Sequence, residues 1–123
     1  MLMKIFKILL LSLLLVGCSN MTYEQISMDE GLELMSKDDS YILLDVRTIE
    51  EYNAGHIPGA HCYPNEDIDE NITNVIYHKD TTIYVYCRSG NRSKQASEKL
   101  VNLGYTDVIE IGGIIDYTGE LEY

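Results

Sequence analysis

Positive charge is scarce in this chain of 123 residues. Lysine and arginine together number 9, against 20 aspartates and glutamates, so the formal net charge is -11. Proteins that bind nucleic acid need cations to neutralise its phosphates, so nucleic acid is not an expected partner. The same acidity argues against electrostatic attachment of the domain to anionic lipid.

Cysteine is also rare, with three residues at positions 18, 62 and 87. So few thiols exclude the disulfide framework that stabilises many small secreted domains. The sequence contains no Cys-x-x-Cys pair, and its three histidines are scattered rather than placed at metal-ligand spacing from a cysteine. We therefore expect neither a metal centre nor a cofactor.

The apolar run at residues 8–16 is too short for an ordinary membrane-spanning helix, which needs about 20 apolar residues. Lys4 and Lys7 precede this run, a layout that predicts a signal peptide over residues 1–17. The sequence LVGC that ends at Cys18 resembles the bacterial lipobox, in which the cysteine is lipidated and the chain is cleaved before it.

We accordingly predict that Cys18 is a lipidated mature N-terminus and that residues 18–22 form a short tether. Two or three acyl chains are enough for stable anchoring. The domain would then be extracytoplasmic, held at the bacterial cell membrane or outer membrane. The alternative is a cysteine that lies in a hydrophobic segment by chance.

Residues 23–123 contain no internal repeat, low-complexity tract or long linker, and their number suits one domain with one core. Predicted strands alternate with predicted helices, which indicates an α/β fold with a mainly parallel sheet. The strands are expected near residues 41–46, 60–63, 81–86 and 108–111, and the helices at residues 27–37, 49–53, 65–77 and 92–103.

The segment IYVYCRSGNRS, residues 83–93, contains the best candidate for chemistry. Cys87 directly follows the clearest strand, and a polar loop leads from it into an amphipathic helix. Ligands of open α/β sheets bind at this end of the strands, and backbone N–H groups at a helix N-terminus attract anions. Arg88 and Arg92 add positive charge that favours the thiolate, the nucleophilic form. The alternative is an ordinary buried cysteine whose neighbouring arginines pair with surface carboxylates.

Four segments, in order and in register, resemble the rhodanese homology domain, a small sulfurtransferase module. They are LLDVR at 43–47, EEYNAGHIPGA at 50–60, YCRSGNRS at 86–93, and the GY and GGI elements between Gly104 and Ile114. The resemblance covers residues 23–117. It implies a three-layer α/β sandwich around a mainly parallel five-stranded sheet, in a single-domain protein that we expect to be a monomer.

The resemblance also implies a thiosulfate sulfurtransferase activity. Cys87 would accept sulfane sulfur from a donor such as thiosulfate, hold it as a persulfide, and pass it to a thiol or to cyanide. The following loop would hold the persulfide through backbone N–H groups; its residues are Arg88, Ser89, Gly90, Asn91 and Arg92.

Supporting roles follow from the same resemblance. Asp45 and Arg47 would support the active-site loop, with Glu51 as a partner of Arg47, and His56 would be a turn residue whose ring bonds the backbone. Tyr117 occupies a position where the family commonly has tryptophan.

Three other functions remain open from the sequence. A phosphatase of related fold would use C-x5-R, whereas Cys87 and Arg92 form C-x4-R, a spacing that suits a smaller group than phosphate. A thiol redox protein would pair Cys62 with Cys87. The position of Cys62 beside the GHIPGA segment is the feature that suggests the two thiols lie near each other. The third is a binding module without catalysis, since a fold does not prove chemistry.

Overall fold

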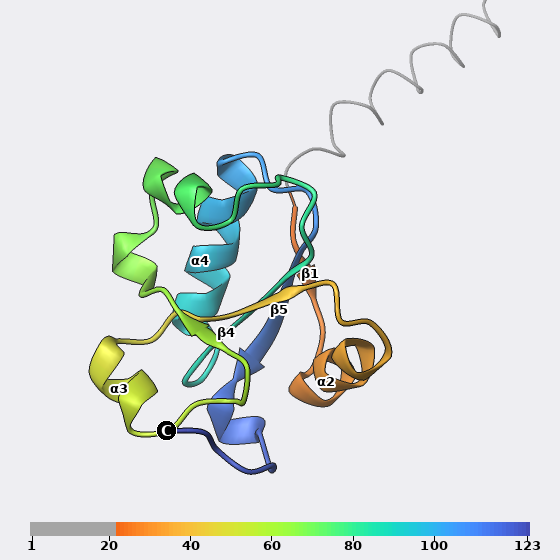
Figure 1. The fold of residues 1–123 in the computed structure, drawn as a ribbon, viewed down its shortest axis with the longest axis vertical. Helices are drawn as coiled ribbons and strands as arrows, with labels where there is room; N and C mark the ends of the chain where they lie inside the picture. Colours follow the sequence, from red (N-terminus) through yellow and green to blue (C-terminus); the bar gives the residue numbers. More distant parts are fainter. Residues whose placement is uncertain (1–21) are drawn as a thin grey trace, which may run out of the picture.

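The computed structural model describes residues 22–123, which form a five-stranded sheet with helices on both faces (Figure 1). The strand order is β1-β5-β4-β2-β3, and every pairing is parallel. The strands are β1 (Glu24–Gln25), β2 (Ile42–Asp45), β3 (His61–Cys62), β4 (Ile83–Cys87) and β5 (Val108–Gly113). The predicted α/β class and parallel sheet are confirmed.

The predicted signal peptide and the lipidation at Cys18 lie outside the described residues. Within residues 22–123, no helix has both the length and the apolar character needed to cross a membrane.

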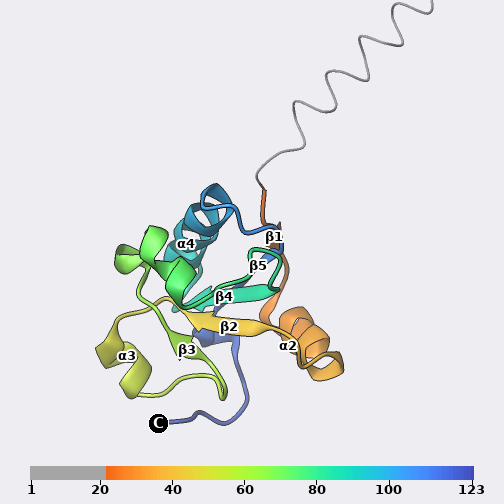
Figure 2. The ribbon, with the colours of Figure 1, turned by 45° about the horizontal axis from the view of Figure 1, so that its top comes forward.

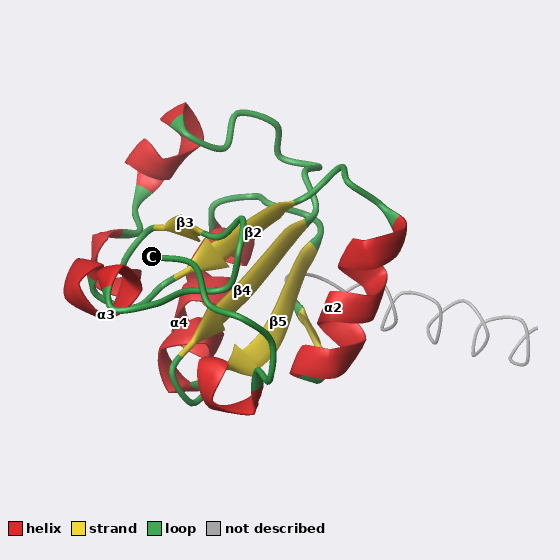
Figure 3. Cartoon of the chain, turned by 60° about the horizontal axis from the view of Figure 1, so that its bottom comes forward, coloured by secondary structure: helices red, strands yellow, loops and turns green. Residues whose placement is uncertain are grey.

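Two layers of helix cover the sheet. The α-helices are α2 (Met28–Lys37), α3 (Ile49–Asn53) and α4 (Asn91–Asn102), and the short 3-10 helices are η1 (Asn65–Asp67), η2 (Glu70–Asn74) and η3 (Ile114–Asp116). Figures 2 and 3 show α2 and α4 on opposite faces of the sheet.

Strand β4 is buried on both faces, as its apolar sequence predicts. Ile83, Val85 and Cys87 belong to the core on the α4 face, and Tyr84 and Tyr86 to the core on the α2 face. Since successive side chains of a strand alternate, this register places the Cys87 side chain on the same face as α4.

Helix α2 begins where the sequence predicts. Ser27 Oγ accepts from the Glu30 N–H at 3.1 Å, and Glu30 Oε1 accepts from the Ser27 N–H at 3.2 Å. This capping box binds two N–H groups that a helix end would otherwise leave unpaired.

The helix predicted over residues 65–77 is wrong, because the structure has the two short helices η1 and η2 there. Ile68, Ile72 and Ile76 are buried as expected, but Val75 is 63% exposed. Asp69 Oδ1 accepts from the Asn71 N–H at 2.9 Å. Asn and Asp side chains that bond nearby backbone compete with a regular helix, which explains the break.

Candidate active site

Cys87 is the last residue of β4, and the chain turns through residues 88–90 into α4. Gly90 is the N-cap residue and has φ +113°, a left-handed conformation that any other residue would adopt only with strain. The predicted strand, loop and helix arrangement around Cys87 is therefore confirmed.

The Cys87 sulfur lies inside this turn, and the residue is only 1% exposed. The Gly90 N–H donates to Cys87 Sγ at 3.0 Å, and Ser93 Oγ lies 3.4 Å from the same sulfur. The first N–H groups of a helix have no partner within it and carry a partial positive charge. Negative charge on this sulfur, or on a group attached to it, is thus stabilised by the start of α4.

The end of β5 and the start of η3 together fix the shape of the loop. The Ile115 N–H donates to the Arg88 carbonyl at 3.3 Å. A Cβ at Gly113 would lie only 2.0 Å from that same carbonyl oxygen. Glycine at position 113 is therefore required for the loop to pack against the end of β5.

Arg92 forms a two-point ion pair with Glu51 of α3. Its Nη1 and Nη2 atoms lie 2.7 and 3.0 Å from Glu51 Oε1 and Oε2. The hydrogen bonds from Arg92 lower the pKa of Glu51 to about 2, and those to Glu51 raise the pKa of Arg92. The Arg92 charge is thus largely paired with a carboxylate. Such pairing of the arginines near Cys87 is the alternative named in the sequence analysis.

The predicted pair between Arg47 and Glu51 is wrong. Arg47 instead bonds Asp45, through Nε to Oδ1 at 2.9 Å and through Nη2 to Oδ2 at 2.6 Å. Burial by itself lowers the pKa of Arg47, but the bonds and charge of Asp45 outweigh burial and raise it. Both carboxylate oxygens of Glu51 bond Arg92, and the charge of Glu51 adds only a smaller effect on the pKa of Arg47 than Asp45 does.

Asp45 also accepts from the Tyr86 hydroxyl at 2.7 Å, and that hydroxyl accepts from the Ile57 N–H at 3.1 Å. Burial, followed by the charge of Asp45, raises the pKa of Tyr86. Arg47 Nη2 adds a bond to the Gly55 carbonyl at 2.8 Å. This buried network joins the ends of β2 and β4 to the GHIPG turn, and the support of the active-site loop by Asp45 and Arg47 stays a prediction.

The sequence pattern of the rhodanese-like domain matches residues 27–119 of this chain. The chain belongs to the rhodanese-like domain family.

Named relatives agree with this membership. The thiosulfate sulfurtransferase PspE of Escherichia coli is 40% identical over 73 residues, which are 59% of this chain and 70% of PspE. The Bacillus subtilis protein YrkF is 33% identical over 99 residues, and the match spans 80% of this chain but only about half, 52%, of YrkF. A rhodanese-like domain protein from Staphylococcus aureus has a similar structure, with a TM-score of 0.70, 31% identity and coverage of 80% and 96% of the two chains.

Cys62 of this rhodanese-like domain lies on β3, two strands away from Cys87. In the sheet register Cys62 pairs with Asp45, and Asp45 pairs with Tyr86. Two strand spacings separate the backbones by about 10 Å, beyond the limit of about 7 Å for a disulfide. Burial, followed by the charge of Asp45, also raises the pKa of the Cys62 thiol, so the geometry favours a packing role.

His56 has the turn role that was predicted. Its Nδ1 lies 2.9 Å from the Tyr52 carbonyl, its Nε2 lies 3.2 Å from Glu122 Oε1, and its ring stacks on Tyr52. With both ring nitrogens bonded, His56 has no free nitrogen to act as a base for Cys87.

The remaining predicted loop residues, Arg88, Ser89 and Asn91, are exposed. Among residues 22–123 their side chains form no ion pair or hydrogen bond, so they face the solvent at the mouth of the site.

The sequence reasoning missed two buried residues beside Cys87, namely Ser93 and Glu110. Glu110 could have been found, because it is the one acidic residue in the apolar strand VIEI. Its burial within a core strand is the kind of exception that indicates a function.

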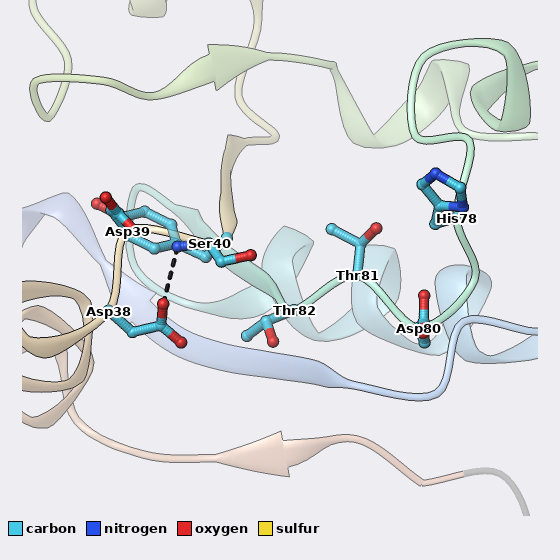
Figure 4. Close-up of a pocket in the computed structure, with 8 residues that line it drawn as sticks. Asp38, Asp39, Ser40, His78, Asp80, Thr81 and Thr82 are labelled. Carbon is cyan, nitrogen blue, oxygen red and sulfur yellow. Dashed lines mark hydrogen bonds between the residues drawn. The ribbon is translucent and has the colours of Figure 1, made fainter.

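The cavities on the surface of residues 22–123 include two near the active-site loop and one at the far end of the sheet. Two of these cavities lie next to residues that contact the loop after Cys87. One, of about 350 Å³, is lined in part by Gly112, and the other, of about 320 Å³, is lined in part by Arg47 and Glu51. The third, of about 550 Å³, lies at the opposite ends of β2 and β4 and is lined by Asp38, Asp39, Ser40, Tyr41, His78, Asp80, Thr81 and Thr82 (Figure 4). It contains no strong nucleophile, and no three His, Cys, Asp or Glu side chains of residues 22–123 are placed to hold a metal ion.

Proposed function

We propose that this protein is a sulfurtransferase in which Cys87 carries sulfane sulfur as a persulfide. The observation that supports this most directly is the Gly90 N–H at 3.0 Å from Cys87 Sγ, at the N-terminus of α4. A donor that already points at the sulfur can stabilise the thiolate before the reaction and an anionic group after it.

The chemistry has two balanced steps. The Cys87 thiolate attacks the outer sulfur of thiosulfate, the S–S bond of thiosulfate breaks, and sulfite leaves with the bonding electron pair. The negative charge of the thiolate then resides on the persulfide. A thiol acceptor, after losing its proton to solvent, or cyanide next attacks the outer sulfur; the bond between the two persulfide sulfurs breaks and the Cys87 thiolate is released, which gives ping-pong kinetics.

Relatives support the same reading, since a thiosulfate sulfurtransferase GlpE from Pseudoalteromonas translucida is 35% identical over 95 residues, 86% of its length. The short C-x4-R spacing and the pairing of Arg92 with Glu51 argue against a phosphatase, which needs several free donors for a phosphate dianion. The separation of Cys62 from Cys87 argues against a redox pair.

The test is to incubate the full chain with thiosulfate in detergent and to measure its intact mass. We expect the protein to gain one sulfur atom and to lose it on addition of cyanide. Cys87→Ser should gain nothing, whereas the matched variant Cys62→Ser should gain sulfur as the unaltered protein does. Absence of the adduct would favour a binding module, and steady phosphate release from an aryl phosphate would favour a phosphatase.

We propose in addition that Cys18 is lipidated and anchors the protein outside the cytoplasm, at the cell membrane or outer membrane. The LVGC sequence and the two preceding lysines support this location. Cells grown with labelled fatty acid should label the unaltered protein but not Cys18→Ala. Equal labelling of both proteins would contradict the assignment.

A further inference from the structure

A second buried acid lies next to the proposed nucleophile. Glu110, on β5, is 3% exposed, and its Oε2 accepts from the Gly112 N–H at 2.8 Å. The same oxygen lies 2.5 Å from Ser93 Oγ, and Ser93 is fully buried. Among residues 22–123 no lysine, arginine or histidine forms an ion pair with Glu110. Burial of a carboxyl group without a cation is costly unless hydrogen bonds compensate for it, so the contacts with Ser93 and the Gly112 N–H matter here.

The single hydrogen of the Ser93 hydroxyl cannot satisfy all of its neighbours. Ser93 Oγ lies 3.4 Å from Cys87 Sγ, 2.9 Å from the Gly90 carbonyl and 3.4 Å from the Gly112 carbonyl, besides the contact with Glu110. Carbonyl oxygens only accept. The Gly90 carbonyl also accepts from the Lys94 N–H at 3.2 Å, which leaves the Ser93 hydrogen for Glu110 or Cys87. A hydrogen bond from Ser93 to both groups at once needs a second proton, carried by Glu110 or by Cys87.

Two arrangements meet this requirement and differ by one proton. In the first, the Cys87 thiol donates to Ser93 Oγ and the Ser93 hydroxyl donates to an ionised Glu110. In the second, a protonated Glu110 donates to Ser93 Oγ and the Ser93 hydroxyl donates to the Cys87 thiolate. The total number of protons is the same in both.

We propose that Glu110 accepts the Cys87 proton through Ser93 and so forms the thiolate without releasing a proton to solvent. The sulfur–hydrogen bond breaks, the Ser93 proton moves to Glu110, and the Cys87 proton replaces it on Ser93. Glu110 acts through Ser93 and does not touch the reacting sulfur, so it is a positioning residue. The role deepens the proposed function and rests on Cys87 being its nucleophile.

Other charges around the cluster are few. On α4, Arg92 contributes positive charge near Cys87 but is bonded to Glu51. On β1, the residue in register with Glu110 is the neutral Gln25. On α2 and η3, Asp29 and Asp116 line the open cavity beside Gly112, where water screens them. Ser93 is thus the direct route between the two acids.

Coupled acids titrate in two steps that belong to the pair. In the unaltered protein, the fraction of Cys87 present as thiolate should rise in two steps as the pH increases. The first step forms the state in which Cys87 and Glu110 share one proton, and the second removes that proton. Glu110→Gln keeps the shape of the side chain but cannot take the proton, so one step should remain. At high pH this variant should react as fast as the unaltered protein or faster, because no carboxylate then opposes the thiolate.

The experiment measures the rate of iodoacetamide alkylation of the peptide containing Cys87, by mass spectrometry, in the full chain between pH 4 and 10. We expect two steps for the unaltered protein and one for Glu110→Gln and Ser93→Ala. Near pH 6 both variants should lose roughly 100-fold in rate, the lower end of the range usual for a lost proton-transfer partner. Asp116→Asn, an exposed acid on η3 next to the same strand, is the matched control and should retain two steps. A single step in the unaltered protein, or two steps in Glu110→Gln, would overturn the proposal.

An infrared difference spectrum gives a second readout that needs no variant to fold. Blocking Cys87 with methyl methanethiosulfonate removes the sulfur charge, so a protonated-carboxyl band of the unaltered protein should disappear. A spectrum with no such band would contradict proton transfer to Glu110. Thiosulfate loading, measured on unblocked protein from the same preparation, separates failure of this role from failure of the sulfurtransferase proposal.

Discussion

The ion pair between Glu51 and Arg92 should make the stability of the domain depend on acid pH. The pair joins α3 to the first turn of α4, and the side chains of Arg92 and Glu51 are 28% and 30% exposed. Glu51→Gln removes the charge while an amide oxygen can still accept from Thr48, the N-cap residue of α3. The substitution therefore tests the charge and leaves the cap in place.

The magnitude follows from the pKa of Glu51, which the hydrogen bonds from Arg92 lower from 4.5 to about 2. Without screening, such a change would be worth roughly 3 kcal/mol at neutral pH. Nearly a third of each side chain is exposed, and solvent screens the pair. We therefore expect Glu51→Gln to lower the free energy of unfolding by about 1 to 2 kcal/mol at neutral pH. Because the folded pKa is the lower one, this stability is present above pH 4.5 and is lost as pH falls toward 2.

Urea unfolding of the unaltered protein and of Glu51→Gln at several values between pH 7 and 3 measures the difference. It should be greatest at pH 7 and should fall by more than half at pH 3. Glu50→Gln is the matched control, since Glu50 is an exposed acid on the same helix. A difference that stays constant with pH, or one that Glu50→Gln reproduces, would refute the role of the pair.

Three further substitutions test the rest of the site. Tyr86→Phe leaves the buried Ile57 N–H without an acceptor and should lower the free energy of unfolding by about 1 to 3 kcal/mol, measured in urea; an unchanged value would mean that the hydroxyl is dispensable. Gly113→Ala places a methyl group 2.0 Å from the Arg88 carbonyl oxygen and so displaces the loop. The rate of thiosulfate loading, measured by intact mass after quenching at set times, should fall roughly 100-fold. Cys62→Ser should leave thiosulfate loading and its reversal by dithiothreitol unaltered, and a slower reversal would restore Cys62 as a resolving thiol.

Much of the fold could be predicted because its determinants are local. The Ser27 and Glu30 capping box, the apolar run of β4 and the glycine after Cys87 each act within a few residues, through hydrogen bonds and burial patterns visible in the chain. The single helix predicted over residues 65–77 was wrong. Isoleucines four residues apart there give the pattern of a helix face, but Asn and Asp side chains break the helix. Strand β1 has only two residues, too few for any periodicity.

The sequence by itself determined the α/β class, the place of Cys87 at the end of its strand, and the loop and helix that follow it. Only the tertiary structure decided which charges meet: Glu51 lies 41 residues from Arg92, and Ser93 lies 17 residues from Glu110. Those contacts depend on the order in which strands pair and on which helix covers which face. Periodicity records whether a side chain is buried, but not which distant side chain it is buried against.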